Sequence, residues 1–166
     1  MDACGNTSTC SFVVTVLPHL RVAFESGSLD DDNKDDDIET DRDEANEFKV
    51  KSKIPHKVRL FDCSGRDVTS HVAKKVTVTL DVTLRRYATP GHSELVTDLP
   101  EKYSGAGHKG GVMELKGGSF HYNLDTTGYP AGTIKNATFI RSHVTVSYDD
   151  APEMLAGEED AWLESK

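Results

Sequence analysis

The side chains best suited to chemistry in this sequence lie in one acidic tract, residues 30–44. Its carboxylates are Asp30, Asp31, Asp32, Asp35, Asp36, Asp37, Glu39, Asp41, Asp43 and Glu44, and its basic side chains are Lys34 and Arg42. A calcium ion takes about six to eight oxygen ligands from a flexible segment. The alternating oxygens therefore predict a Ca²⁺-binding loop. Its ligands would be Asp31, Asn33, Asp35, Asp37, Asp41 and Asp43.

Two positions in this tract depart from the usual calcium loop. Asp36 stands where a glycine normally makes the sharp turn, and Arg42 stands at the position of the bidentate glutamate. A neighbouring carboxylate would have to replace that ligand. Runs of like charge more often form solvated linkers. Two interpretations therefore remain open: a calcium site, and a solvated linker.

The histidines and the remaining candidate nucleophiles give weaker signals. Seven histidines are spread along the chain without an HxH or HExxH pair, which predicts scattered surface groups rather than a transition-metal site. Cys63 with His71, or a serine with His92 and Asp98, has the residue types for nucleophilic catalysis. Neither set has the strand-turn-helix context of an activated nucleophile. We therefore predict that the chain is not an enzyme.

The three cysteines allow at most one disulfide within the chain. Cys4 and Cys10 flank a short polar stretch and can pair with each other or with a partner outside the chain. Cys63 lies in a predicted turn without a basic cluster to activate it, which predicts a free thiol.

Charge and hydropathy narrow the classes of partner. The net charge of -9 disfavours nucleic acid, which requires basic side chains against its phosphates, and it disfavours anionic membrane surfaces. No run of about 18 apolar residues predicts a membrane-spanning segment. The first residues lack the basic start and apolar stretch of a signal peptide. The acidic charge suits divalent cations, basic partners or simple solubility.

Period-2 alternation is the main structural signal, and it predicts strands. Apolar residues alternate with polar ones in residues 76–84, 120–124 and 144–148. A strand is also predicted over residues 11–17, which are rich in β-branched side chains, and a short one over 112–115. Residues 87–111 are predicted to be mostly loop, and residues 155–166 a short acidic helix. Short strands separated by glycine and proline turns indicate an antiparallel sandwich or barrel. Its predicted core is Val78, Leu80, Tyr122, Leu124, Val144 and Val146.

Two stretches of the sequence resemble the bacterial PxKF-motif Ig-like domain. Residues 53–62, KIPHKVRLFD, resemble its opening motif, with Val58 in place of the aromatic residue, and a turn over residues 62–65 follows. Residues 118–133, GSFHYNLDTTGYPAGT, are similar to its second motif. The resemblance covers about residues 48–149 and implies an immunoglobulin-like antiparallel β-sandwich without catalytic activity.

The N-terminal residues resemble a different Ig-like module. Residues 2–16, DACGNTSTCSFVVTV, are similar to the last hairpin of a hyalin repeat. The two resemblances imply four parts: a remnant strand over 1–18, an acidic linker over 19–47, an Ig-fold domain over 48–150 and an acidic tail over 151–166.

The resemblances imply a structural or adhesive module of a larger secreted or surface-displayed protein, of bacterial origin, whose signal peptide lies outside this sequence. Its partners would be other protein domains or copies of itself, without nucleic acid or membrane insertion. The alternative is a self-assembling filament or oligomer subunit that donates the strand from Cys10 to Leu17 to a neighbour. The donated face would carry Phe12, Val14 and Val16.

Overall fold

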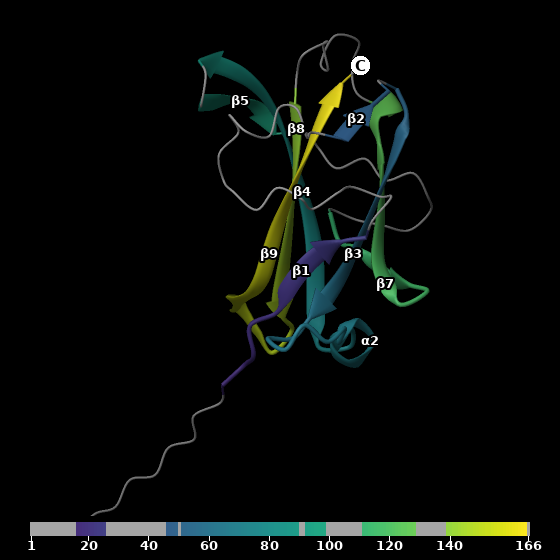
Figure 1. The fold of residues 1–166 in the computed structure, drawn as a ribbon, viewed down its shortest axis with the longest axis vertical. Helices are drawn as coiled ribbons and strands as arrows, with labels where there is room; N and C mark the ends of the chain where they lie inside the picture. Colours follow the sequence, from purple (N-terminus) through teal and green to yellow (C-terminus); the bar gives the residue numbers. More distant parts are fainter. Residues whose placement is uncertain are drawn as a thin grey trace, which may run out of the picture.

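The computed structural model describes residues 16–25, 46–49, 51–89, 92–98, 111–128 and 139–165. They form two sheets packed face to face (Figure 1). The four-stranded sheet has the order β1 (Arg21–Phe24), β3 (Lys53–Phe61), β7 (Ser119–Asp125), β6 (Glu114–Lys116). The five-stranded sheet has the order β2 (Asn46–Phe48), β9 (Ala151–Ser165), β8 (Phe139–Tyr148), β4 (Val76–Thr89), β5 (His92–Asp98). The predicted all-β sandwich is confirmed.

The strands of each sheet are antiparallel neighbours, with one exception. The short β2 runs parallel to the end of β9, in the register Asn46↔Leu163 to Phe48↔Ser165. The longest antiparallel ladders join β8 to β4 on one side and to β9 on the other. β8 is therefore the central strand of the five-stranded sheet.

Alternation along the strands fills the space between the sheets. On β4, apolar side chains from Val76 to Leu84 are buried, while the threonines between them point to the other face of the sheet. The predicted core residues Val78, Leu80, Tyr122, Leu124, Val144 and Val146 are all 1% exposed or less. The core prediction is confirmed.

The predicted acidic helix at the C-terminus is wrong, because these residues form β9. Alanine, glutamate and leucine favour a helix by only a few tenths of a kcal/mol per residue, roughly. Without β9, the edge of β8 would leave a row of backbone N–H and C=O groups unpaired beside the core. Backbone pairing with β8 outweighs the helix propensity of these residues, and Ala156, Ala161 and Leu163 become buried. β9 is thus part of the sandwich and not a tail that follows it.

The range expected to be an acidic linker, residues 19–47, begins with a strand. Leu20, Val22 and Phe24 are buried, and β1 pairs with β3. Just before β1, the Leu20 N–H donates to the carbonyl oxygen of Ala156 on β9, at 2.7 Å. The chain therefore contacts the five-stranded sheet before it joins the four-stranded one.

The predicted long loop over residues 87–111 is only partly correct. β4 continues to Thr89 and pairs with β5, and side chains beyond Arg85 on this hairpin lie outside the described residues. After it, Gly111 and Met113 bond to the backbone of Leu80 and Val78 at the edge of β4. The predicted strand at 112–115 is displaced to β6, which lies in the other sheet.

The described helical segments are the four-residue α2 (Thr69–Val72) and the 3-10 turn η1 (Thr126–Gly128). Within the described part of the chain, no helix has the length and hydrophobicity needed to cross a membrane. α2 lies between β3 and β4 at one end of the sandwich, and the C-terminal end of β9 lies at the opposite end (Figure 1).

Candidate binding surface

One carboxylate holds together the turn that follows β3. Asp62 Oδ1 accepts hydrogen bonds from the Ser64 backbone N–H at 2.9 Å, the Ser64 hydroxyl at 2.5 Å and the Arg66 backbone N–H at 3.0 Å. Its Oδ2 accepts two more from the Arg66 guanidinium. The Ser64 hydroxyl, followed by the Arg66 N–H, lowers the pKa of Asp62 to about 2. At Gly65 the backbone φ is 78°, a conformation that favours glycine, and the predicted turn is confirmed.

The turn leads into α2, which is fixed to the end of β3 by a buried threonine. The Leu60 N–H donates to Thr69 Oγ1 at 2.9 Å, and the Val68 N–H donates to the Leu60 carbonyl at 2.8 Å. The Thr69 N–H donates in turn to Asp67 Oδ1 at 2.9 Å. These bonds complete the backbone pairing of β3 beyond the end of β7, and they place the Asp67 carboxylate beside Arg59.

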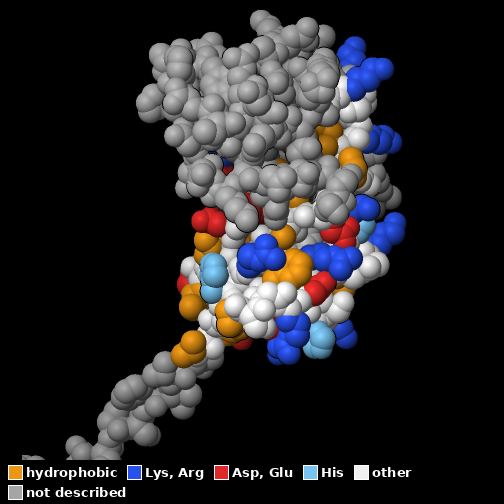
Figure 2. All heavy atoms as spheres, in the orientation of Figure 1, with side chains coloured by type: hydrophobic (Ala, Val, Ile, Leu, Met, Phe, Trp, Pro, Cys, Tyr) orange, Lys and Arg blue, Asp and Glu red, His pale blue; other side chains and the backbone are white. Residues whose placement is uncertain are grey.

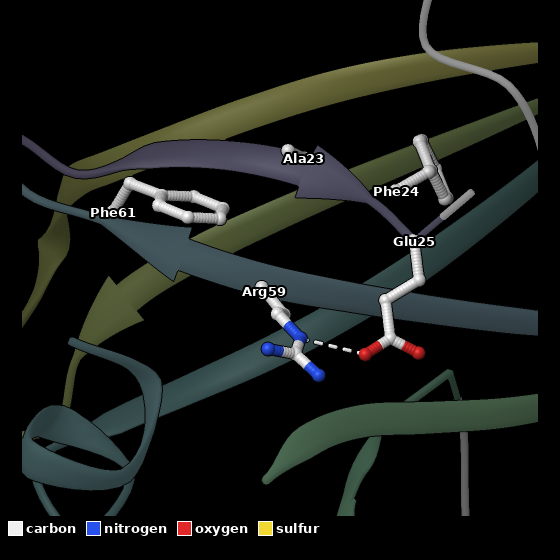
Figure 3. Close-up of a pocket in the computed structure, with 5 residues that line it drawn as sticks. All are labelled: Ala23, Phe24, Glu25, Arg59 and Phe61. Carbon is white, nitrogen blue, oxygen red and sulfur yellow. Dashed lines mark hydrogen bonds and ion pairs between the residues drawn. The ribbon is translucent and has the colours of Figure 1, made fainter. Parts of the chain in front are cut away.

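Arg59, on β3, is the centre of the candidate surface. Its Nε donates to Glu25 Oε1 at 2.6 Å (Figure 3). Its Nη1 donates to Asp67 Oδ2 at 3.1 Å. The guanidinium of Arg21 lies 4.6 Å from the ring centroid of Phe61, in a cation–π contact. We call these five residues, all on the outer side of β1, β3 and the following turn, the Arg59 surface.

Two shallow hollows flank the Arg59 side chain. The first, of about 320 Å³, is lined by Ala23, Phe24, Glu25, Arg59 and Phe61. The second, of about 370 Å³, is lined by Arg59, Asp67, Ser70, His71, Gly117 and Gly118. Figure 3 shows the Arg59 and Glu25 side chains pointing toward each other across the first hollow. The Arg59 side chain, which is 44% exposed, thus separates two recesses that open to solvent.

The charges of this surface are fixed by mutual contact. The hydrogen bond from Arg59 lowers the pKa of Glu25, and the same bond raises the pKa of Arg59. Partial burial tends to raise the pKa of Asp67, but hydrogen bonds from Thr69 and Arg59 outweigh it and lower that pKa. All three groups are therefore charged near neutral pH.

Further basic groups border the Arg59 surface on the four-stranded sheet. Lys57 pairs in register with His121, and Lys116 pairs with Ser119. Burial, followed by the charge of Lys57, lowers the pKa of His121. In Figure 2, Lys and Arg side chains mix with hydrophobic and acidic ones over the lower, coloured half of the molecule. The chain is acidic overall, yet this face gathers cations.

A second polar cluster lies on the outer face of the five-stranded sheet. Arg141 on β8 donates from Nε and Nη2 to the carboxylate of Asp160 on β9, at 3.0 and 2.5 Å. His143 Nδ1 lies 2.8 Å from Asp160 Oδ1, and its Nε2 lies 3.6 Å from Glu158. The hydrogen bond to Asp160 is the main cause of a raised pKa at His143.

His143 is expected to stabilise the fold at acidic rather than alkaline pH. Its folded pKa lies above the unfolded value, so its contribution is present below the unfolded pKa and is lost as pH rises through the folded one. Replacing His143→Gln should reduce stability by up to about 1 kcal/mol at pH 6, as for a partly exposed pair, and by less at pH 9. Urea unfolding at both pH values measures this. An equal loss at both pH values would contradict it.

One histidine is not a surface group, contrary to the prediction. His56 and Ser142 are both 0% exposed, and His56 Nε2 lies 2.8 Å from Ser142 Oγ. A serine and a histidine at this separation have the geometry of a nucleophile and its base. Because both are sealed between the sheets, a substrate has no access to them. The pair is therefore a structural element of the core.

The other predicted site residues fall mostly outside the described residues. These are the calcium ligands Asp31, Asn33, Asp35, Asp37, Asp41 and Asp43, the cysteines Cys4 and Cys10, and the apolar residues Phe12 and Val14. Val16 is described and is 83% exposed. Cys63 is an exposed free thiol, as predicted. Among the described residues, no three His, Cys, Asp or Glu side chains form a group that could hold a metal ion.

The Arg59 surface was not predicted, although part of its signal was present. Leu20, Val22 and Phe24 alternate with Arg21 and Glu25, which is the pattern of a half-buried strand. The neighbouring proline and the acidic tract obscured this short run. The contacts of Arg59 with Glu25 and Asp67 depend on strand register and on α2, which no local pattern reveals.

The comparison with known sequences does not assign this chain to a family. No family model and no curated protein matches the chain. The resemblances to PxKF-motif and hyalin-repeat domains therefore rest on the sequence motifs at residues 53–65, 118–133 and 2–16.

Proposed function

We propose that this chain is an immunoglobulin-like, non-catalytic module that acts by binding or spacing in a secreted or surface-displayed protein. The strand order is the observation that carries the proposal. In the immunoglobulin sandwich, strands A, B, E and D form one sheet and strands C, F and G form the other, with C′ added in variable-type domains. The order β1-β3-β7-β6 corresponds to A-B-E-D, and the order β9-β8-β4-β5, which follows the short edge strand β2, corresponds to G-F-C-C′.

The Arg59 surface supports a role in binding. Its charged side chains are partly exposed and held in fixed positions by one another, and two hollows flank Arg59. Charges arranged in this way contribute to the specificity and speed of association more than to affinity. The partners that fit this proposal are other protein domains or further copies of the chain.

The acidic tract supports the calcium-binding part of the proposal. It lies in the segment that connects β1, in one sheet, to β2, in the other. Calcium bound by its carboxylates would remove their mutual repulsion and restrict the connection between the two sheets. We therefore include Ca²⁺ in the proposal, with the ligands Asp31, Asn33, Asp35, Asp37, Asp41 and Asp43.

Calorimetric titration with Ca²⁺, together with melting curves, tests this proposal. A site of the strength found in extracellular modules should show a dissociation constant of about 0.1 to 1 mM. Since a ligand that binds only the folded state stabilises it, 10 mM Ca²⁺ should add about 1.4 to 2.7 kcal/mol. The triple variant Asp31→Asn, Asp35→Asn, Asp37→Asn should lose both effects.

The matched control is Asp150→Asn with Glu153→Gln, which removes one acidic side chain from the turn between β8 and β9 and one from the start of β9. This variant should bind Ca²⁺ like the parent chain. Absence of heat and of a melting shift in the parent chain would remove calcium from the proposal. Multimers in sedimentation velocity that become monomers when residues 1–17 are deleted would instead support strand donation.

A further inference from the structure

The His56–Ser142 pair joins the two sheets through the middle of the core. His56 lies on β3, in the four-stranded sheet, and Ser142 lies on β8, in the five-stranded sheet. His56 Nδ1 lies 3.2 Å from the carbonyl oxygen of Ile54, an acceptor, so Nδ1 carries the proton. Nε2 is then the acceptor, and the Ser142 hydroxyl donates to it across the core. The imidazole is neutral in this arrangement.

The described side chains buried around His56 include no carboxylate that would stabilise a charged ring. The ring of Phe24, on β1, lies 6.4 Å away between centroids, at an interplanar angle of 62°. Val58 on β3, Leu124 on β7 and Ile140 on β8 are fully buried apolar residues of the same core. On the neighbouring strand β7, the buried titratable side chain is Tyr122, which pairs in register with His56. Among the described side chains, no Asp, Glu, Lys or Arg is buried.

This environment favours the neutral ring strongly. Burial lowers the pKa of His56 to about 4, against the partial compensation of backbone contacts at Ile54 and Tyr122. Protonation at Nε2 would also reverse this bond, because Nε2–H would then donate to Ser142 Oγ and the Ser142 hydroxyl proton would have to turn to another acceptor in the core. Both effects act on the contact that connects the sheets.

We propose that the buried His56–Ser142 hydrogen bond is an acid-sensitive tie between the two sheets, which opens the sandwich when His56 takes up a proton. β3 and β8 correspond to strands B and F, which antibody domains join with a disulfide. A hydrogen bond at the corresponding strands holds the sheets without oxidation and releases them reversibly with pH. The inference stands on the buried contact and does not depend on the proposed binding function.

The sign of the pH dependence follows from the direction of the shift. A histidine whose folded pKa lies below its unfolded value contributes stability that is fully present above the unfolded value. That contribution is lost as pH falls toward the folded pKa. As the pH falls from 7.5 to 5, loss of the His56 contribution should raise the unfolding equilibrium constant about 30-fold.

Urea unfolding at a series of pH values tests the proposal. The double variant His56→Leu, Ser142→Ala removes both polar groups. Between pH 7.5 and pH 5, the increase in its unfolding constant should be smaller than that of the parent chain by a factor of about 30. His71→Gln, which removes an exposed histidine, is the matched control and should keep the parental pH dependence. A double variant with the parental pH dependence would overturn the proposal.

A second measurement does not depend on a variant that folds. An NMR titration of the parent chain follows the His56 ring protons and the ladder amides of β3 and β8. The proposal requires that His56 stays neutral in the folded chain down to about pH 5. It also requires that ring protonation accompanies loss of the folded signals. A ring that titrates near pH 6.5 in a chain that remains folded would overturn it.

Discussion

Gly157→Ala is expected to destabilise the protein by about 3 kcal/mol or more, through a clash that no side-chain rotation can relieve. A Cβ at this position would lie 2.1 Å from the Leu20 carbonyl oxygen and 3.2 Å from a Val22 methyl group. The segment before β1 would have to move away from β9, which breaks the Leu20–Ala156 hydrogen bond. Denaturant unfolding measures the loss.

Gly65→Ala is the matched control for that substitution. Gly65 has a φ of 78° but nothing within 4 Å of an added Cβ, so its replacement meets backbone strain without a clash. Its expected cost is about 1 kcal/mol. If the two alanine variants were equally stable, the close approach of β1 to β9 would not be a feature of the folded protein.

Leu60→Ala is expected to cost about 2 to 5 kcal/mol, the range for removing a large apolar side chain from a packed core. Leu60 is 0% exposed and lies on β3 directly between Arg59 and Phe61. The substitution leaves a cavity under the Arg59 surface. The backbone bonds between Leu60 and the α2 segment do not need the side chain, so α2 should remain docked. Chemical unfolding gives the loss, and amide shifts of α2 report its docking.

Val16→Ala removes an apolar side chain that is 83% exposed, and it serves as the comparison. Substitutions at such positions usually change stability by less than about 0.5 kcal/mol. A loss similar to that of Leu60→Ala would mean that Val16 is covered by another part of the protein or by a second copy. That outcome would favour the strand-donation alternative.

The stability contributions of His56, in the core, and His143, on the outer face of the five-stranded sheet, change with pH in opposite directions. His56 is neutral because it is buried without a counter-charge, whereas His143 favours the charged form because Asp160 bonds to it. Acid therefore weakens the contact in the core while it preserves the one on the outer face of β8 and β9. The stability lost in the His56 and His143 variants should change with pH in opposite directions, which would separate the two contributions.

Local pattern was sufficient to predict the centre of the sandwich. β4, β7 and β8 each have strict alternation over several residues. In a strand with one buried face, this alternation identifies which side chains point into the core. The core residues predicted from them are buried, and the turn after β3 was predicted from its glycine and polar residues.

Predictions from the sequence pattern were wrong where a strand forms only by pairing with another strand. β9 has a helical composition, but the open edge of β8 makes it a strand, because unpaired backbone groups beside a core cost more than propensity supplies. β1 is short, and its alternation gains meaning only when β3 and β9 lie beside it. In both cases the deciding partner is distant in the sequence.

The amino-acid sequence by itself determined the fold class and the core, since period-2 alternation leaves one way to bury the apolar faces of β4, β7 and β8. The tertiary structure decided the polar contacts. Ser142 is 86 residues from His56, and Glu25 is 34 residues from Arg59. The partner of a polar side chain is set by strand order and register, which arise only when both sheets have formed.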